Sequence, residues 1–219
     1  MKTIYLVRHG ESENNAAGTY NTPDAKLSAR GEAQAEEIAA RCEKLQIDAI
    51  IASPMVRAKD TAAIVAARVG KSIETSDLFM ERRMASSLQG RSRKDPEVIK
   101  IMKELNAHLA DTEYKYEDGE SFQELMGRAV ACLDLLAKRP EESLLVVTHG
   151  FFMHIIAAAV IFGKDITGTE CSHILRGLQV MRNTGLTVLS YEESDARNSI
   201  DGFGSPWQLR VWNDHAHLW

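Results

Sequence analysis

Short apolar runs alternate along this chain with longer segments in which apolar residues recur every three or four positions. The runs have the length and composition of strands buried on both faces. They cover residues 2–7, 48–53, 72–76, 144–148 and 186–191, and a sixth strand is expected over 207–212, at an edge. Strands that alternate with helices predict an α/β fold with a mostly parallel sheet covered on both faces.

Four amphipathic helices are predicted between the strands, each with a start or stop signal in the sequence. They run from Ser28 to about Leu45, from a cap at Ser53-Pro54 to Gly70, from the capping box at Ser121 to a point before Pro140, and from His149-Gly150 to about Gly163.

Residues 82–120 interrupt this alternation, because they are charged and irregular apart from one amphipathic piece near Pro96–Leu109. We therefore expect a single domain over residues 1–219. In it, 82–120 is an insertion over the carboxyl edge of the sheet that acts as a lid or specificity segment.

Composition and charge narrow the choice of partners. The 219-residue chain has a net charge of −5, which argues against nucleic acid as a partner but leaves a small anionic substrate open. No window approaches the roughly 20 apolar residues of a membrane span, and no secretory signal is visible. We expect a cytoplasmic protein; the sequence leaves both a monomer and a homo-oligomer open.

The three cysteines, Cys42, Cys132 and Cys171, are far apart and form no zinc spacing. Cys42 and Cys132 fall on apolar helical stripes, so buried free thiols are expected.

Four segments with reactive side chains follow predicted strands. They carry Arg8-His9-Gly10 with Asn15 close behind, then Arg57, then Glu81, then His149-Gly150. Loops at the carboxyl ends of strands in an α/β sheet are where ligands bind. Two histidines that each precede glycine at an apolar strand end suggest one shared site.

This set of side chains matches the needs of phosphomonoester cleavage. His9 is the candidate nucleophile, because an imidazole is partly neutral near its reference pKa of ~6.5. Glu81 is the candidate acid that protonates the leaving oxygen. The phosphate oxygens would be held by Arg8, Asn15, Arg57 and protonated His149. This chemistry needs no metal ion or other cofactor.

Each of these residues also has an ordinary structural interpretation. A strand-end histidine is commonly a hydrogen-bonded structural residue, Arg57 alone would be a solvated helix residue, and Glu81 would form a surface salt bridge. His154 is expected in packing. Ser12 and Ser53 lack a nearby His/Asp arrangement, which argues against serine hydrolase chemistry.

Taken in order, the segments resemble the histidine phosphatase superfamily, in its phosphoglycerate mutase-like branch. The matching motifs are Leu6-Val7-Arg8-His9-Gly10-Glu11-Ser12, Leu27-Ser28-Ala29-Arg30-Gly31, Ser53-Pro54-Met55-Val56-Arg57-Ala58, Glu81-Arg82, Gly119-Glu120-Ser121 and Val146-Val147-Thr148-His149-Gly150. The resemblance implies a three-layer α/β/α sandwich, a phosphohistidine on His9 and no metal. It also implies a phosphate pocket of Arg8, Arg57 and His149, with Asn15 at a phosphate-contacting position and Glu81 as the proton donor.

Two departures from the mutase pattern favour a phosphatase. Mutases of this branch usually carry a Trp-Asn pair soon after the first motif, where this chain has Ser12-Glu13-Asn14-Asn15. They also tend to follow the acidic residue with arginine, histidine, tyrosine and glycine, whereas Glu81 is followed here by Arg82-Arg83-Met84-Ala85. We expect a metal-independent phosphatase of a small phosphorylated metabolite. A cofactor-dependent phosphoglycerate mutase or related phosphotransferase is the alternative, and a protein-directed or non-catalytic phosphate-binding member is the third.

Basic residues gather in or near the expected insertion, namely Arg82, Arg83, Arg91, Arg93 and Lys94. They would favour a substrate with a second anionic group; a solvated charged loop is the alternative.

Overall fold

A six-stranded sheet with the order β3-β2-β4-β1-β5-β6 forms the centre of the fold. The computed structural model describes residues 1–193 and 205–218. The strands are β1 (Lys2–Arg8), β2 (Ala49–Ala52), β3 (Ile73–Thr75), β4 (Ser143–Thr148), β5 (Leu186–Tyr191) and β6 (Trp207–Asp214). The pairs from β3 to β1 are parallel, and β5 is antiparallel to both neighbours. The mostly parallel sheet and its sixth strand at an edge are therefore confirmed.

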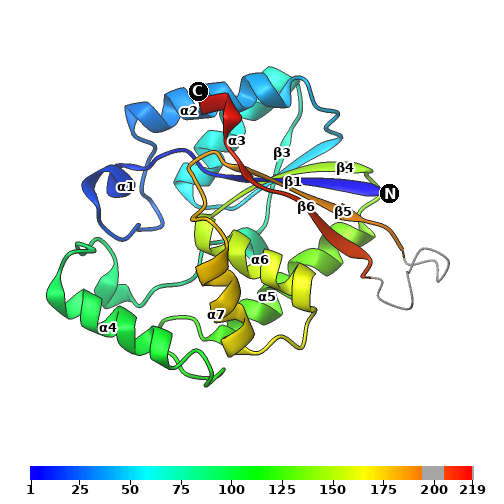
Figure 1. The fold of residues 1–219 in the computed structure, drawn as a ribbon. Helices are drawn as coiled ribbons and strands as arrows, with labels where there is room; N and C mark the ends of the chain where they lie inside the picture. The colour runs from blue at the N-terminus through cyan, green and yellow to red at the C-terminus, as the bar shows by residue number, and fades with distance from the viewer. Residues whose placement is uncertain (194–204, 219) are drawn as a thin grey trace.

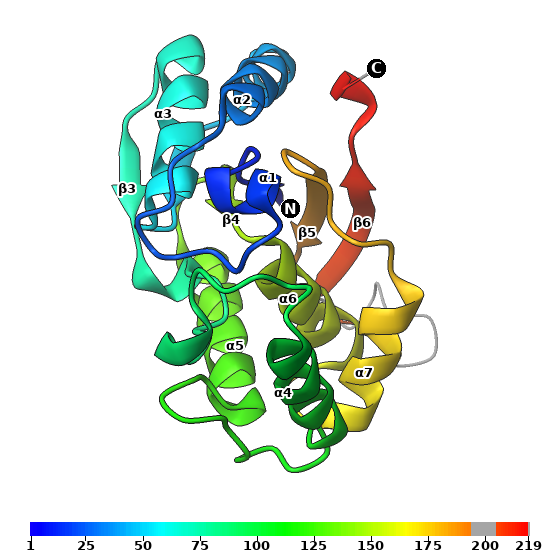
Figure 2. The same cartoon turned by 90° about the vertical axis from the view of Figure 1, so that its left-hand side faces the viewer.

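Helices cover both faces of this sheet. On one face lie α2 (Ala29–Cys42) and α3 (Val56–Val69), and on the other α5 (Phe122–Lys138) and α6 (Gly150–Phe162) with α7 (Gly168–Gly177) packed on α6. In Figure 1 the sheet separates these two helix layers, and Figure 2 shows the same arrangement of helices, sheet and helices from another side. This is the three-layer α/β/α arrangement that the family resemblance implied.

The central strand β4 shows why the layers form. All six of its residues are buried. Leu144 and Val146 belong to the core under α5 and α6, whereas Leu145 and Val147 belong to the core under α2 and α3. Successive side chains of a strand point to opposite faces, so one apolar run supplies both cores.

Some predicted boundaries are wrong. The first long helix ends at Cys42 rather than Leu45, and the predicted strand over 72–76 shortens to three residues at the sheet edge. Ser53 is not the cap of α3, which begins at Val56 after Met55 and has no side-chain cap. The five-residue helix α1 (Glu13–Ala17) and α7 were not anticipated.

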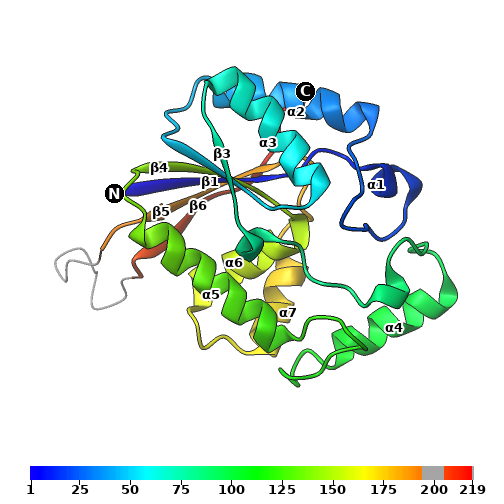
Figure 3. The ribbon, with the colours of Figure 1, turned by 180° about the vertical axis from the view of Figure 1, so that it is seen from behind.

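Residues 82–120 lie beyond the carboxyl end of β1, on the same side as α1 (Figures 1 and 3). They contain α4 (Pro96–Ala107), which matches the predicted amphipathic piece. The short 3-10 helix η2 (Ser86–Leu88) lies within them, whereas η1 (Asp77–Phe79) precedes them and η5 (Ala216–Leu218) closes the described chain. The segment has a small apolar core of its own, made by Ala85, Leu88, Val98, Ile101 and Leu105.

This segment is attached to the rest of the molecule at both ends of α4. Near its start, Tyr20 and Arg91 form a backbone hydrogen bond of 3.0 Å. Beyond α4, the Leu109 carbonyl lies so close to Gly168 that a Cβ there would be 1.6 Å from its oxygen. The segment therefore forms a wall beyond the carboxyl edge of the sheet.

The sequence also made predictions about the cysteines and about membrane-spanning segments. Cys42, Cys132 and Cys171 are buried free thiols, as predicted, and burial raises their pKa values to about 12, 12 and 11. Within the described ranges, the structure has no helix both long and apolar enough to cross a bilayer.

Candidate active site

The two histidines of the sequence motifs lie side by side at the carboxyl edge of the sheet. β1 and β4 are parallel neighbours with Arg8 opposite Thr148, so the next residues, His9 and His149, leave the sheet together. Their ring centroids are 5.1 Å apart, and both rings are almost completely buried.

Hydrogen bonds define the protonation of the His9 ring. Its Nδ1 lies 2.6 Å from the Gly10 carbonyl, which can only accept, so Nδ1 carries a proton. Its Nε2 accepts from the Arg57 Nε–H at 3.1 Å. Burial, aided by Arg57 and Arg8, holds the pKa of His9 well below its usual value. His9 is thus a neutral imidazole whose Nε2 lone pair faces the arginines.

The His149 ring has the opposite arrangement. Its Nδ1 accepts from Arg57 Nη2 at 3.1 Å, so the neutral ring carries its proton on Nε2 and donates it to Ser53 Oγ at 2.8 Å. Burial and the Arg57 charge hold the pKa of His149 well below its usual value. Burial disfavours the charged ring, so the protonated His149 expected from the sequence would need an anion beside the ring.

Ser53 therefore has a role that the sequence did not reveal. The sequence predicts no His/Asp arrangement near it, and the structure adds a histidine alone, because His149 lies within hydrogen-bond distance. The serine is nevertheless fully buried, and the other nitrogen of His149 faces the Arg57 cation rather than a carboxylate. This geometry differs from a serine hydrolase triad, so Ser53 orients His149.

Arg57 forms hydrogen bonds to both histidine rings. Only 1 % of its surface is exposed, which excludes the solvated helix residue considered from sequence. Besides both rings, it donates to the Thr22 carbonyl at 3.0 Å. Burial lowers its pKa to about 10, so the guanidinium remains charged at neutral pH.

Arg8 brings a second guanidinium into the same pocket. It donates to the Met181 carbonyl and, at 3.4 Å, to Asn15 Oδ1. Its Nε–H is buried without a hydrogen-bond partner in the described residues. A Cβ on Gly150 would lie 3.1 Å from this Nε, so the glycine leaves room for the guanidinium. An orphaned charged donor beside Arg57 suits an anion.

Asn15 lies at the border of this group. Its Oδ1 is also 3.4 Å from Asn183 Nδ2, and Asn183 donates to the His9 carbonyl at 3.1 Å. Asn183 was missed from sequence, because only its position just before β5 marks it and no motif surrounds it. It fixes the backbone of His9.

Glu81 lies against the start of α6 and not on the open surface. Its Oε1 accepts from the backbone N–H of Phe152 at 3.0 Å and of Arg82 at 2.9 Å, and its Oε2 from Phe151 N–H at 3.3 Å. These bonds aim the carboxyl group at the cavity that it lines with Arg8 and Arg57.

Arg128 of α5 holds the loop that carries Glu81. Its guanidinium donates to the carbonyls of Leu78, Met80 and Glu81 at 3.1, 2.6 and 3.3 Å. It pairs with Glu120 at 2.8 Å, and the pair is largely buried. The sequence pointed to Glu120 within a motif but gave no signal for Arg128.

A cavity of about 720 Å³ opens above these groups. Arg8, Arg57 and Glu81 lie on its wall, whereas the buried histidines lie behind it. Five methionines also line it, namely Met55, Met80, Met84, Met102 and Met181. Its size lies within the range of pockets that bind small molecules.

The segment 82–120 contributes part of this wall. Of its basic residues, Arg82, Arg83 and Arg93 line the cavity. Arg91 instead pairs with Asp95 and Glu97, and Lys94 is exposed. Arg176 of α7, which the sequence did not single out, also lines it.

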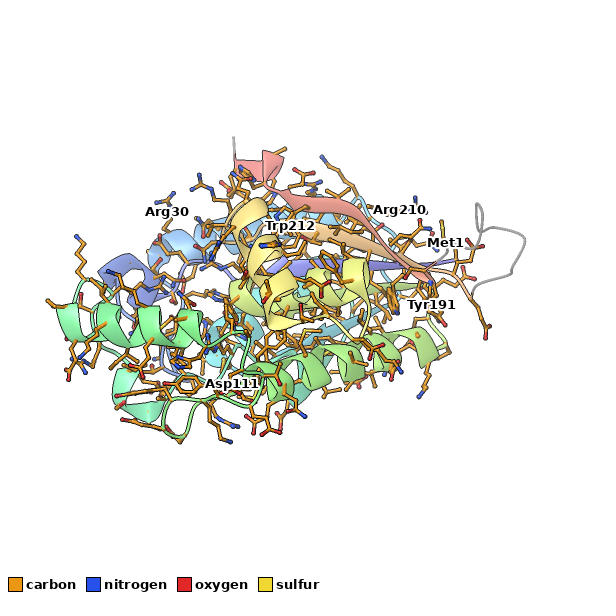
Figure 4. The ribbon with its side chains drawn as sticks, turned by 60° about the horizontal axis from the view of Figure 1, so that its bottom comes forward. Met1, Arg30, Asp111, Tyr191, Arg210 and Trp212 are labelled. Atoms are coloured by element: carbon orange, nitrogen blue, oxygen red, sulfur yellow. The ribbon has the colours of Figure 1, made fainter. Side chains whose placement is uncertain are left out.

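His154 packs as the sequence suggested. Its Nδ1 lies 2.8 Å from the Gly150 carbonyl, and its ring packs edge-on against Trp212 with the ring centroids 4.8 Å apart. Trp212, labelled in Figure 4, extends from β6 toward the α6–α7 layer. Over residues 1–193 and 205–218, no three His, Cys, Asp or Glu side chains are grouped to hold a metal ion.

Comparison with known proteins agrees with this geometry. The family model of the histidine phosphatase superfamily (branch 1) matches residues 4–200. The chain is 31% identical over its whole length to a protein of Enterobacter sp. (strain 638) named "Probable phosphoglycerate mutase GpmB", 95% of which is covered.

Two solved structures share the fold at 24% identity. YhfR of Bacillus stearothermophilus has a TM-score of 0.80, with all of both chains covered. A mycobacterial glucosyl-3-phosphoglycerate phosphatase with bound VO3 has a TM-score of 0.77, with 98% of this chain and 100% of that chain covered.

Proposed function

Since this chain belongs to the histidine phosphatase superfamily (branch 1), we propose that it is a metal-independent phosphatase that hydrolyses a small phosphomonoester through a phosphohistidine on His9. The observation that carries the proposal is the state of the His9 ring. A neutral imidazole with its proton fixed on Nδ1 presents the Nε2 lone pair to a pocket that contains two guanidinium groups.

In the first half-reaction, the His9 Nε2 lone pair forms a bond to phosphorus as the bond to the leaving oxygen breaks. Arg8, Arg57 and His149 bind the phosphoryl oxygens, and Asn15 supports Arg8. The Arg8 Nε–H, which is buried and unpaired in the described residues, would gain an acceptor. Glu81 gives its proton to the leaving oxygen, so an alcohol departs.

In the second half-reaction, water attacks phosphorus and the bond to Nε2 breaks. The Glu81 carboxylate takes a proton from the water, which restores the acid, and inorganic phosphate leaves. His149 supports the added charge: a phosphate dianion beside its ring would favour the protonated form that burial disfavours.

A phosphoglycerate mutase is the second candidate, because the Enterobacter relative carries that name. A mutase must keep water from the phosphoenzyme and return the phosphoryl group to a bound product. The cavity of about 720 Å³ is much larger than a three-carbon acid requires. This and the two departures from the mutase motifs favour hydrolysis.

We place the reaction in the cytoplasm. The support is three buried free thiols, which fit a reducing compartment.

A phosphate-release screen with a parallel mutase assay tests the proposal. The panel would hold sugar phosphates, phosphoglycerates, nucleotides and phosphoamino acids, with chelator present throughout, and a second assay would follow 3- to 2-phosphoglycerate conversion. We expect release from at least one class and a loss of about 10³-fold or more in His9→Ala. Isomer conversion without release would instead identify a mutase, and silence in both assays would favour a protein substrate or a binding role.

A further inference from the structure

A tight turn at residues 182–185, just before β5, contacts the backbone of Arg8 and His9. The Thr184 N–H donates to the Arg8 carbonyl at 3.0 Å and also lies 3.4 Å from the His9 carbonyl oxygen. The Asn183 side chain donates to the same His9 carbonyl at 3.1 Å. The position of the His9 backbone therefore depends on the conformation of this turn.

Thr184 has an unusual backbone conformation in this turn. It is fully buried with a φ of 57°, and the turn is closed by a hydrogen bond of 3.0 Å from the Gly185 N–H to the Arg182 carbonyl. Glycine is the usual residue where the third position of a turn has a positive φ. A β-branched residue is strained there and keeps this conformation only where its surroundings hold it. The contacts of the Thr184 side chain therefore bear on the placement of His9.

The Thr184 hydroxyl is held by a histidine near the end of the chain. It donates its only proton to the Asn183 carbonyl at 2.7 Å, so it accepts from the His217 Nε2–H at 3.1 Å. The neutral His217 ring then accepts at Nδ1 from Arg41 Nη1 at 3.5 Å. Burial, aided by the Arg41 charge, lowers the pKa of His217 to about 4. The ring therefore keeps this tautomer at neutral pH.

The C-terminal segment that carries His217 is attached both to α2 and to the turn. Arg41 of α2 forms an ion pair with Asp214, and Figure 1 shows the C-terminus beside α2. Asn213 Oδ1 accepts from the Arg182 N–H at 2.8 Å. These contacts fix His217 relative to the turn, although more than 170 positions of sequence separate it from Arg41.

We propose that Thr184 and His217 are positioning residues for the reaction. The hydrogen bond between them holds the 182–185 turn, and with it the His9 backbone, in the place from which the His9 Nε2 attacks phosphorus. Neither residue is among those that line the cavity in the described part of the chain. Glycine would adopt this turn without strain, whereas threonine supplies the hydroxyl that His217 binds. The proposal rests on the proposed phosphatase function and adds residues that act without touching the substrate.

Variants that remove either partner of this hydrogen bond test the proposal on the best substrate of the screen. Thr184→Ala removes the hydroxyl, and His217→Phe keeps a ring but removes the N–H. We expect kcat to fall about fivefold or more in each with KM changed by less than about twofold, because displacing a reacting group slows the chemical step. Thr184→Ser and His217→Gln keep a hydroxyl and an N–H donor, so each should retain about half of kcat or more.

Three further variants separate positioning from stability. The double variant Thr184→Ala/His217→Phe should be no slower than the slower single variant, because both changes remove the same bond. Thr184→Gly should have a higher Tm than Thr184→Ala, since glycine fits the positive φ, but an equally low kcat. Ser190→Ala is the matched control: it removes a hydrogen bond of 2.8 Å from Arg210 at the opposite end of β5, and kcat should be unchanged. An unchanged kcat in Thr184→Ala, single effects that multiply in the double variant, or a kcat that simply follows Tm would overturn the proposal.

A signal from the His9 ring separates this proposal from the phosphatase function. The His9 Nδ1–H lies 2.6 Å from the Gly10 carbonyl, and proton–nitrogen NMR should show it as a signal that is absent from His9→Ala. The signal should shift or broaden in Thr184→Ala and stay unchanged in Ser190→Ala. If no substrate is hydrolysed but the signal responds in this way, the phosphatase function fails and the positioning role stands. If hydrolysis depends on His9 but kcat is unchanged in Thr184→Ala and His217→Phe, the positioning role fails alone.

Discussion

Arg57 gives the two active-site histidines different tautomers. It donates to Nε2 of His9 and to Nδ1 of His149, and acceptors on the far side of each ring take the remaining proton. The Gly10 carbonyl fills this place for His9 and the Ser53 hydroxyl for His149. In the proposed mechanism, this difference lets His9 act as the nucleophile and His149 as a partner for phosphate.

Ser53→Ala tests the orientation of His149. The substitution leaves Nε2–H without its acceptor, and a neutral hydrogen bond of this kind contributes about 0.5–1.5 kcal/mol. We expect kcat to fall about threefold to tenfold with little change in KM, measured on the best substrate of the screen.

Ser143→Ala is the matched control, because Ser143 is a buried serine at the opposite end of β4. Unchanged kcat in Ser53→Ala, or an equal fall in both variants, would contradict this role.

At the residue scale, the sequence identified the groups that carry charge or a lone pair but not those that orient them. Arg8, His9, Arg57 and His149 were predicted and lie together. Ser53 was interpreted as a helix cap. Local patterns predict caps. The hydrogen bond between Ser53 and His149 joins residues 96 positions apart, so it depends on which strands become neighbours.

At the element scale, the loop after β1 that carries His9 is fixed by its close approach to the start of α2. A Cβ on Gly31 would lie 1.9 Å from the Glu11 carbonyl oxygen, and one on Gly10 would lie 2.4 Å from the Gly31 carbonyl oxygen. Ser28 caps the helix and also donates to Glu11. Gly31, from the Leu27–Gly31 motif, thus allows the loop of the Leu6–Ser12 motif to pack against α2.

Gly31→Ala should therefore destabilise the fold, by about 1–3 kcal/mol in the free energy of unfolding, because loop and helix must separate. Gly127→Ala is the control. That glycine lies within α5 with open space around its Cα, so alanine should stabilise by about 0.5–1 kcal/mol. Urea denaturation measures both, and a Gly31→Ala protein as stable as wild type would refute the argument.

Element prediction succeeded where periodicity is long and failed where it is short. The long helices on the sheet faces bury regular stripes and were anticipated. Helix α1 has five residues and none is buried, so it offers no periodic signal. Its N-terminus is instead defined by a capping box between Ser12 and Asn15.

At the scale of the whole molecule, the strand order assembles the site. Three of the four reactive segments follow β1, β2 and β4, which are adjacent and parallel, so their carboxyl ends meet at one edge. The sequence predicted this class of sheet, but strand order and the antiparallel β5 depend on contacts between distant segments. The same topology buries both histidines, which links stability to pH.

Stability should fall as the solution becomes acidic. In the unfolded chain, His9 and His149 take up protons near pH ~6.5, whereas in the native state their pKa values are well below this. The unfolded state therefore binds more protons below this pH, so the free energy of unfolding decreases from about pH 7 to about pH 5. The measurement is Tm against pH.

His149→Gln should flatten this slope, because one native-state histidine that resists protonation is removed. His173→Gln is the control, since His173 is exposed. A Tm that is constant or rises on acidification over this range would contradict the burial of neutral histidines.

The central claim is a covalent phosphohistidine on His9, and rapid-quench labelling tests it most directly. The protein would be mixed with a phosphoryl-labelled substrate, quenched in alkali within milliseconds, digested and analysed by mass spectrometry. The account predicts a label on the peptide that contains His9, stable in alkali, lost in acid and absent from His9→Ala. Label on another residue, or substrate turnover without any labelled protein, would contradict it.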